Sequence, residues 1–212
     1  MKFTSIGLET AEVTVSRHSE PCLTVKCLEP EGTVERKVYP MQLTIENLKI
    51  IWEKTRNLHH LFDVATKDDF PAFCRLFMVG DTTDLQPTGL FWVVDDFIGL
   101  FYLTDMVLGV DANVHYIFFD RRHHGRAELC REMIKYVFRK YVFQRLTTLV
   151  PYYSRKGVFF FITSLGFKKE GRKRKARWYK DDWFDLGIFG ILRTEALNGG
   201  KNGLVSAQVS GA

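Results

Sequence analysis

A strand-like run, a basic loop with one glycine and a helix-like run follow one another in this chain, and this order constrains its fold most. The strand-like run covers residues 114–119, the loop residues 121–127 and the helix-like run residues 128–140. A loop that enters a helix directs free backbone N–H groups and the positive end of the helix dipole toward one point. Gly125 permits close backbone approach there. The order therefore predicts an anion site, and a phosphate group is its natural occupant.

Hydrophobic periodicity places further helices and strands on both sides of this loop. Thr44 is a suitable N-cap for the first helix, Thr66 or Asp69 for the second, and Pro40 is expected to end the first strand. Helices are predicted at residues 45–56, from about 67–69 onward, at 128–140 and at 155–165, and strands at 35–39, 89–94, 97–103, 114–119, 145–150, 167–175 and 183–192. Because helix 128–140 joins two strands, those strands should be parallel neighbours.

The composition is that of a globular protein with a substantial core. Hydrophobic residues make up 46% of the chain, and 18 residues are Phe, which is far from a disordered composition. No apolar run approaches the roughly 20 residues that a membrane helix needs. The first residues lack the apolar segment of a signal peptide. We therefore expect a cytoplasmic protein without a membrane partner.

The cysteines and histidines do not form a pattern typical of a metal site. The four cysteines contain no C-x-x-C pair, and the two histidine pairs, at 59–60 and 123–124, consist of adjacent residues. Adjacent side chains point in different directions and chelate a metal poorly. We expect reduced, structural thiols and no metal.

A cluster of eight Lys and Arg residues at 168–180 accounts for much of the net charge of +5. Such a cluster can bind nucleic acid. A solvated hairpin edge near an anionic cofactor explains it equally well. Because no nucleic-acid-binding motif accompanies the charge, nucleic acid is the less favoured partner.

The motif and the order of elements together resemble the GNAT superfamily of CoA-dependent N-acyltransferases. The signature of that superfamily is Q/R-x-x-G-x-G/A, and residues 122–127, Arg-His-His-Gly-Arg-Ala, fit it. The C-terminal half looks closer to the branch of ribosomal-protein and spermidine N-acetyltransferases. The residues that match this branch are Gly125, Ala127, Phe143, Leu146, Val150, Leu165-Gly166-Phe167, Glu170-Gly171, Arg174, Asp185 and Ile191-Leu192-Arg193.

This resemblance implies an α/β fold (mixed α+β) with helices that flank a central, mixed, mostly antiparallel sheet. One parallel pair of strands in that sheet would splay apart at the CoA site. We expect the GNAT domain to span residues 35–193. An N-terminal arm or extra strands would occupy residues 1–34, and a flexible tail would occupy residues 194–212.

The resemblance also implies acetyl-CoA as the cofactor. The loop and helix start would hold the diphosphate, and backbone groups of the strand before them would bind pantetheine and polarise the thioester carbonyl. The same residues also fit an ordinary core strand and helix start with solvated arginines. The expected cofactor-binding residues are Ile117, Phe118, Phe119, Arg121, Arg122, His123, His124, Gly125, Arg126, Ala127 and Arg155.

Two departures from the family pattern concern the acid that protonates the leaving thiolate. Many GNAT enzymes have a tyrosine four residues before the Gly of Leu-Gly-Phe, and this chain has Ile162 there. In the ribosomal-protein branch an Asn and a Ser begin the same helix, and the aligned residues here are Arg155 and Val158. CoA binding is therefore better supported by the resemblance than catalysis is.

The strongest candidate for the base that accepts the amine proton is His115. Its unperturbed pKa lies near 6.5, and strand alternation places it on one face with Ile117 and Phe119. Asp105 and Asp120 are rivals, and a chain of water molecules would remove the need for a dedicated base. The alternative to a catalytic role is a structural histidine whose hydrogen bonds are satisfied within the sheet.

Replacement acids can come from the residues that follow strand 145–150. Tyr153 and Ser154 precede the next helix and are the candidates for contact with a thiolate; Tyr152 is a further one. The tyrosines equally fit aromatic packing, and Ser154 is more typical of a helix N-cap.

Two functions fit the sequence. The first is an N-acetyltransferase that moves an acetyl group from acetyl-CoA to a primary amine on a protein N-terminus, a polyamine or a small molecule. The second is a catalytically inactive GNAT-fold protein that serves binding or assembly, because the usual acids are replaced. A homodimer or another assembly partner fits either function. The sequence contains no pattern that identifies the acceptor.

Overall fold

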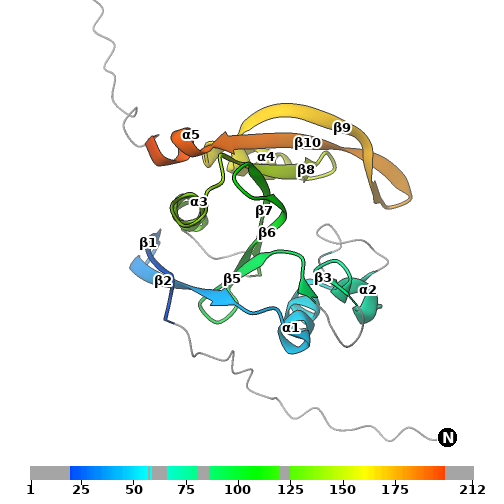
Figure 1. The fold of residues 1–212 in the computed structure, drawn as a ribbon, viewed down its shortest axis with the longest axis horizontal. Coiled ribbons are helices and arrows are strands. Elements are labelled where there is room, and N and C mark those ends of the chain that lie inside the picture. Colours follow the sequence, from blue (N-terminus) through cyan, green and yellow to red (C-terminus); the bar gives the residue numbers. More distant parts are fainter. Residues whose placement is uncertain (1–19, 57, 59–65, 81–85, 120–124, 199–212) are drawn as a thin grey trace, which may run out of the picture.

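An eight-stranded sheet runs through the molecule and carries helices on both faces (Figure 1). The structure is a computed structural model that describes residues 20–56, 58, 66–80, 86–119 and 125–198. Its elements are β1 (Leu23–Glu29), β2 (Gly32–Met41), α1 (Ile45–Thr55), α2 (Phe70–Cys74), β3 (Met78–Val79), β4 (Gln86–Pro87), β5 (Leu90–Val94), β6 (Gly99–Val107), β7 (Asp111–Phe118), α3 (Arg126–Lys140), β8 (Arg145–Pro151), α4 (Lys156–Ser164), β9 (Lys168–Tyr179), β10 (Asp182–Leu192) and α5 (Arg193–Asn198).

The large sheet is mixed and mostly antiparallel, as the family resemblance implied. Its strands lie in the order β1-β2-β5-β6-β7-β8-β10-β9, and β3 pairs with β4 in a separate two-stranded sheet. The pair formed by β7 and β8 is parallel, and every other neighbouring pair described in the large sheet is antiparallel. Helix α3 connects the two parallel strands, so the predicted crossover unit is confirmed.

The strand expected at residues 35–39 is longer than predicted, because β2 continues through Pro40. Pro40 lies opposite Trp92 of β5, whereas the pairing of β2 with β1 reaches only Val38. On the β1 side, therefore, no ladder hydrogen bond from residue 40 is needed, and a proline is tolerated. The prediction that Pro40 ends the strand was wrong for this reason.

Two hydrophobic clusters cover opposite faces of the central strands. Trp92 and Val94 of β5 belong to a cluster that includes the buried side of α3, which defines the α3 face. Phe91 and Val93 of the same strand belong to a cluster with α1 and α2, which defines the α1 face. Strict alternation along β5 thus sends successive side chains into different cores.

The helix boundaries follow the predicted capping residues in the first half of the chain. The Thr44 side chain accepts a hydrogen bond from the Asn47 N–H at the start of α1, and Asp69 accepts one from Ala72 at the start of α2. Helix α4 ends before Gly166, whose φ of 99° suits a residue without a side chain. These signals are local, which explains why they could be predicted from sequence.

The N-cap role expected for Ser154 was wrong. The N-cap of α4 is Arg155, whose side chain makes no capping hydrogen bond. The Ser154 backbone N–H donates to the Pro151 carbonyl at 2.9 Å, so Ser154 lies in the turn that precedes the helix.

The described residues outside the expected domain limits form strands on the N-terminal side and a helix on the C-terminal side. Strand β1 and the first residues of β2 lie in the stretch expected as an arm or extra strands, and they pair with each other from Leu23↔Val38 to Glu29↔Gly32. Helix α5, at residues 193–198, occupies the start of the expected tail, and residues 199–212 lie outside the described part. The division at 34/35 and 193/194 stays a prediction.

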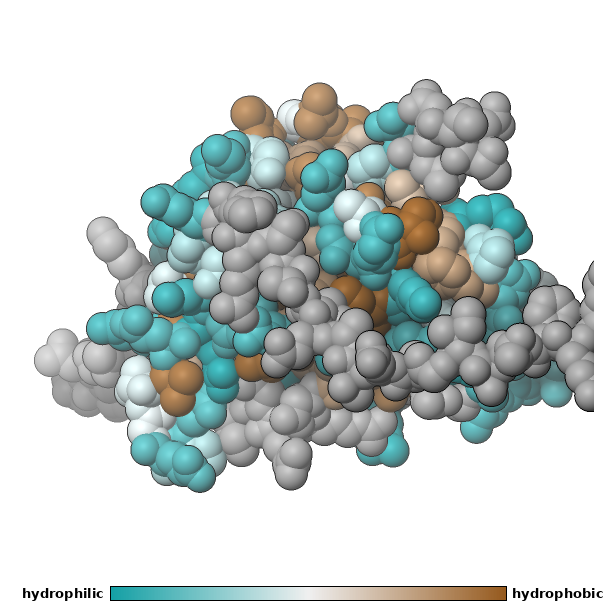
Figure 2. All heavy atoms as spheres, turned by 90° about the horizontal axis from the view of Figure 1, so that it is seen from below, coloured by the Kyte–Doolittle hydropathy of each residue, from teal (hydrophilic) through white to brown (hydrophobic). Residues whose placement is uncertain are grey.

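No helix in the described part of the chain is long and apolar enough to cross a membrane. The face seen in Figure 2 shows hydrophobic residues in separate groups among hydrophilic ones. Within the described residues, no group of three or more His, Cys, Asp or Glu side chains is arranged to hold a metal ion.

Candidate cofactor and active site

The parallel strands β7 and β8 are paired with each other at one end only. Their shared register position is Asn113↔Thr147, near the start of both strands. At this end the Thr147 hydroxyl donates to Asp111 Oδ2 at 2.7 Å, and the Arg145 guanidinium lies 3.4 Å from the same oxygen. Along its length, β7 also pairs with β6, and β8 also pairs with β10. The two strands are therefore held together at the end opposite the loop that leads to α3.

Helix α3 begins directly after Gly125, which has the left-handed φ of 71°. The Gly125 carbonyl accepts the hydrogen bond of Leu129 N–H at 3.0 Å, so the helical ladder starts at this residue. The N–H groups of the first turn that follow have no partner within the helix, as at every helix start. Arg126 lies there too, with its guanidinium 5.9 Å from the centre of the Phe118 ring.

Strand β1 packs closely against this helix start, which the sequence did not predict. A Cβ atom added to Gly125 would lie 2.4 Å from Cys27 Cβ, and the Cys27 thiol donates to the Gly125 carbonyl at 3.6 Å. Burial raises the pKa of the Cys27 thiol to about 11, so it stays protonated and can donate. Glycine at position 125 is thus required by the fold as well as by the predicted cofactor.

The expected cofactor-binding residues before Gly125 are only partly described. Ile117 is buried on the α1 face, whereas Phe118 packs on the α3 face. Phe119 lies under the Lys54 ammonium of α1, 5.6 Å from its ring centre, and its N–H donates to the Ile98 carbonyl at 3.0 Å. Four of the remaining expected residues, Arg121, Arg122, His123 and His124, lie outside the described residues.

His115 lies on the α1 face, stacked on Tyr102 of β6. The two rings are 4.5 Å apart between centres and nearly parallel at 8°, and the residues are register partners. His115 Nε2 lies 2.9 Å from the Thr104 hydroxyl oxygen. Burial lowers the pKa of His115 to about 4, and the nearby Asp105 carboxylate opposes this shift. The ring is therefore neutral near pH 7 and can accept a proton only weakly.

We expect a pH-dependent contribution of His115 to stability. Its pKa is about 4 in the folded chain against a model-compound value of 6.5, so between these values the unfolded chain binds more protons. The free energy of unfolding must then fall as the pH drops from about 6.5 to 4, by about 1–3 kcal/mol from this group. His115→Gln should remove that part of the slope in urea titrations at several pH values. If the free energy of unfolding changed with pH equally in the variant and in the wild-type chain, the burial of a neutral His115 ring would be contradicted.

Asp105, the rival base, belongs to a polar group at the end of β6. Its carboxylate accepts a hydrogen bond from the Asn113 side-chain amide at 2.7 Å and a longer one from the Thr104 hydroxyl at 3.4 Å. Thr104 thus connects His115 to Asp105. Asp120, the second rival, lies outside the described residues.

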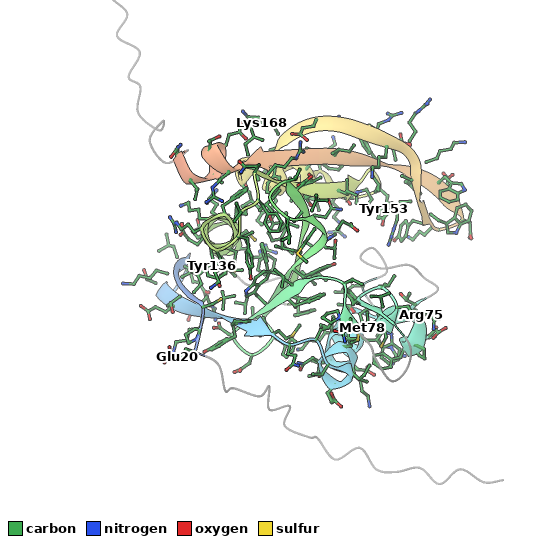
Figure 3. All side chains as sticks on the ribbon, in the orientation of Figure 1. Glu20, Arg75, Met78, Tyr136, Tyr153 and Lys168 are labelled. Carbon is green, nitrogen blue, oxygen red and sulfur yellow. The ribbon has the colours of Figure 1, made fainter. Side chains whose placement is uncertain are left out.

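Tyr153 is brought to the same face as His115 by the turn after β8. Its ring stacks on Tyr179 at 4.1 Å between centres and meets Phe184 edge-on at 5.3 Å. Phe189 and Ile191 of β10 belong to the α3-face cluster, so Phe184 has the opposite orientation by alternation. Figure 3 shows Tyr153 beneath the β9–β10 hairpin, on the side of α1 and α2. Tyr152 points to the other face, where Lys169 and Arg172 lie over its ring.

The two positions where the family keeps its acid hold apolar side chains with different environments. Ile162 is buried in the α3-face cluster, with 4% of its surface exposed. Val158 is 41% exposed in the first turn of α4, one turn after Arg155. Neither side chain can donate a proton.

Three residues of this region were missed by the sequence analysis. Tyr102 and Thr104 both contact His115, and Arg177 of β9 is close enough to oppose, with its charge, the rise in the pKa of Tyr102 that burial causes. Tyr102 and Thr104 lie in a strand-like run, and Arg177 lies in a block of eight similar residues. Only the three-dimensional arrangement separates them from their neighbours.

The described part of the chain contains a mixed sheet with one parallel pair of strands, which are paired at one end only. The helix that connects these two strands begins after a glycine with a left-handed φ. Residues 92–188 match the family model described as Acetyltransferase (GNAT) domain. This match confirms the resemblance to the GNAT superfamily that was drawn from the sequence. No curated protein sequence matches the chain.

Solved structures with the same fold include several spermidine N-acetyltransferases. A chimera of SpeG from Vibrio cholerae with hSSAT is 19% identical, with a TM-score of 0.61 over 76% of this chain and 98% of its own. A GNAT-family acetyltransferase from Bacillus anthracis is 13% identical, with a TM-score of 0.54 over 82% and 100%. A dodecameric spermidine N-acetyltransferase from Vibrio cholerae is 17% identical, with a TM-score of 0.57 over 78% and 98%. At these identities the likeness shows the fold.

Proposed function

We propose that this chain is a CoA-dependent N-acetyltransferase that moves an acetyl group from acetyl-CoA to a primary amine. The observation that carries the proposal is the parallel pair of β7 and β8, joined at Asn113↔Thr147, with the α3 start at Gly125 following β7. The GNAT domain match over residues 92–188 supports it. In the reaction a C–N bond to the amine forms, the C–S bond of the thioester breaks, the amine loses a proton and the thiolate gains one.

The cofactor side of the site would be formed by the start of α3 and the end of β7. The first-turn N–H groups after Gly125 and the guanidinium of Arg126 suit a diphosphate, because both are donors and the helix start favours negative charge. The basic loop residues before Gly125, together with Ala127 and Arg155, complete the proposed set. Backbone groups of residues 117–119, apart from the Phe119 N–H that donates to the Ile98 carbonyl, would hold the thioester of acetyl-CoA.

The acceptor side would lie on the α1 face, where His115 and Tyr153 are found. With its Nε2 next to the Thr104 hydroxyl, His115 is held in a fixed orientation. A neutral imidazole can accept a hydrogen bond from the acceptor amine, although its pKa of about 4 makes it a weak proton acceptor. Tyr153 would be the acid for the thiolate, and Ser154, in the turn beside it, is the second candidate.

Acetyl-CoA should stabilise the protein in a concentration-dependent way. A ligand that binds the folded chain alone adds about 2.7 kcal/mol at 100 times its Kd, which should raise the melting temperature by several degrees. The control ligand is acetylated pantetheine, which lacks the diphosphate and should shift the melting temperature much less. Equal shifts from both ligands would argue against a diphosphate site at α3. No shift at millimolar acetyl-CoA would overturn the proposed function.

A second candidate function is a GNAT-fold binding protein without catalysis, and the apolar residues Ile162 and Val158 favour it. Only the first function forms a product, whereas the second is compatible with the presence or the absence of bound CoA. A melting shift with acetyl-CoA, without release of free thiol in the presence of any amine, would favour the binding protein. The dodecameric neighbour supports an assembly of several copies in either case.

A further inference from the structure

The basic cluster at residues 168–180 divides into residues with an acidic partner in the described part of the chain and residues without one there. Arg172 pairs with Asp185 at 2.8 Å, and Lys168 pairs with Glu195 of α5. Among the described residues, the other six have no carboxylate within ion-pair distance: Lys169, Lys173, Arg174, Lys175, Arg177 and Lys180. A charge without such a partner is available to a ligand.

Two of these six cations, Lys173 and Arg177, lie on the face of the sheet that carries His115. In the β9–β10 pairing, Arg177 is opposite Phe184 and Lys173 is opposite Leu186. Directly opposite residues of antiparallel strands share a face. Phe184 lies on the α1 face, against Tyr153, and Leu186 lies there by alternation from Phe189, because the register of β10 with β8 is regular between them. Arg177 and Lys173 therefore lie on the α1 face with the proposed acceptor side.

Arg177 is more buried than the other basic residues of β9. It is half-buried, whereas Lys173, Arg174 and Lys175 on the same strand are exposed. Its positive charge acts on the hydroxyl of the buried Tyr102, the ring on which His115 stacks. A half-buried guanidinium gains more from a bound anion than a fully solvated one does.

We propose that the acceptor is a primary amine that carries carboxylates, with Arg177 binding a carboxylate and Lys173 adding attraction. This inference rests on the proposed function and names its substrate class. The same charges repel a polycation, because like charges brought together at a binding site are costly. A polyamine such as spermidine should therefore be a poor acceptor, although the similar structures include spermidine N-acetyltransferases.

The test compares peptide acceptors of equal length that differ in side-chain charge, together with two small amines. The wild-type chain is assayed with acetyl-CoA and the tripeptide amides Ala-Glu-Glu, Ala-Gln-Gln and Ala-Arg-Arg, with free glutamate and with spermidine. We expect kcat/KM for Ala-Glu-Glu to exceed that for Ala-Gln-Gln by about ten- to a hundredfold, the range of one charge-assisted hydrogen bond. Preference for Ala-Glu-Glu over glutamate identifies an acidic peptide, and the reverse identifies a small anionic amine.

Variants on the two faces of β9 supply the matched controls. Arg177→Glu should abolish the preference for Ala-Glu-Glu or reverse it, Arg177→Lys should keep part of it, and Lys169→Glu, on the other face, should leave it unchanged. Arg177→Gln is the substitute if the Glu variant melts early. Equal rates for the three peptides, or a preference for spermidine, overturn the anionic acceptor while the acetyltransferase stands. No transfer to any amine overturns both.

Discussion

Gly125→Ala should lower the free energy of unfolding by about 2–5 kcal/mol. Two effects add: a non-glycine residue in the left-handed region costs about 1–2 kcal/mol, and overpacking a filled site costs about 1–3 kcal/mol. The φ of Gly125 is 71°, and an added Cβ would lie 2.4 Å from Cys27 Cβ. Urea denaturation measures the loss.

Gly109 provides a matched control for the first of these effects. Its φ is 77°, and nothing lies within 4 Å of an added Cβ. Gly109→Ala should therefore cost only about 1–2 kcal/mol. The double variant Cys27→Gly/Gly125→Ala should lose less than the sum of its single changes, because the overlapping side chain is gone. Equal losses of the free energy of unfolding in the Gly109→Ala and Gly125→Ala variants would show that β1 is not packed tightly against the start of α3.

Arg126→Glu should raise the KM for acetyl-CoA by about ten- to a hundredfold and leave kcat much less changed. A guanidinium at the helix start would bind phosphate in the ground state and in the transition state alike, so its loss weakens uniform binding. Arg139→Glu is the control, since it makes the same charge change in the last turn of the same helix. Steady-state kinetics at varied acetyl-CoA concentration measure KM and kcat for both variants. A similar KM for both variants would remove Arg126 from the cofactor site.

Most of the sheet and its helices could be predicted because their signals are local. Alternating apolar residues, the caps Thr44 and Asp69 and the glycine that ends α4 each act within a few residues. The contact of Cys27 with Gly125 joins residues 98 positions apart and leaves no local pattern. The same is true of the long hairpin, which brings Tyr179 and Phe184 onto Tyr153.

The site was predicted less completely than the fold for a related reason. The sequence pointed to His115 through its unperturbed pKa near 6.5, but the structure surrounds the ring with Tyr102 and Thr104 and lowers its pKa to about 4. A pKa depends on neighbours from other strands, and no spacing rule reveals them. The basic block showed its charge in the sequence, but only the register of β9 with β10 assigns Arg177 to the α1 face.

The most direct measurement of the proposed activity is acetyl transfer by the wild-type chain. Acetyl-CoA and an amine acceptor are mixed with the protein, free thiol is followed with time, and the acetylated amine is identified by mass spectrometry. We expect thiol and acetylated amine to appear in equal amounts, at a rate proportional to protein concentration and lowered by Arg126→Glu at limiting acetyl-CoA. Bound acetyl-CoA without any acetylated product, across anionic, neutral and cationic amines, would contradict the assignment as an acetyltransferase.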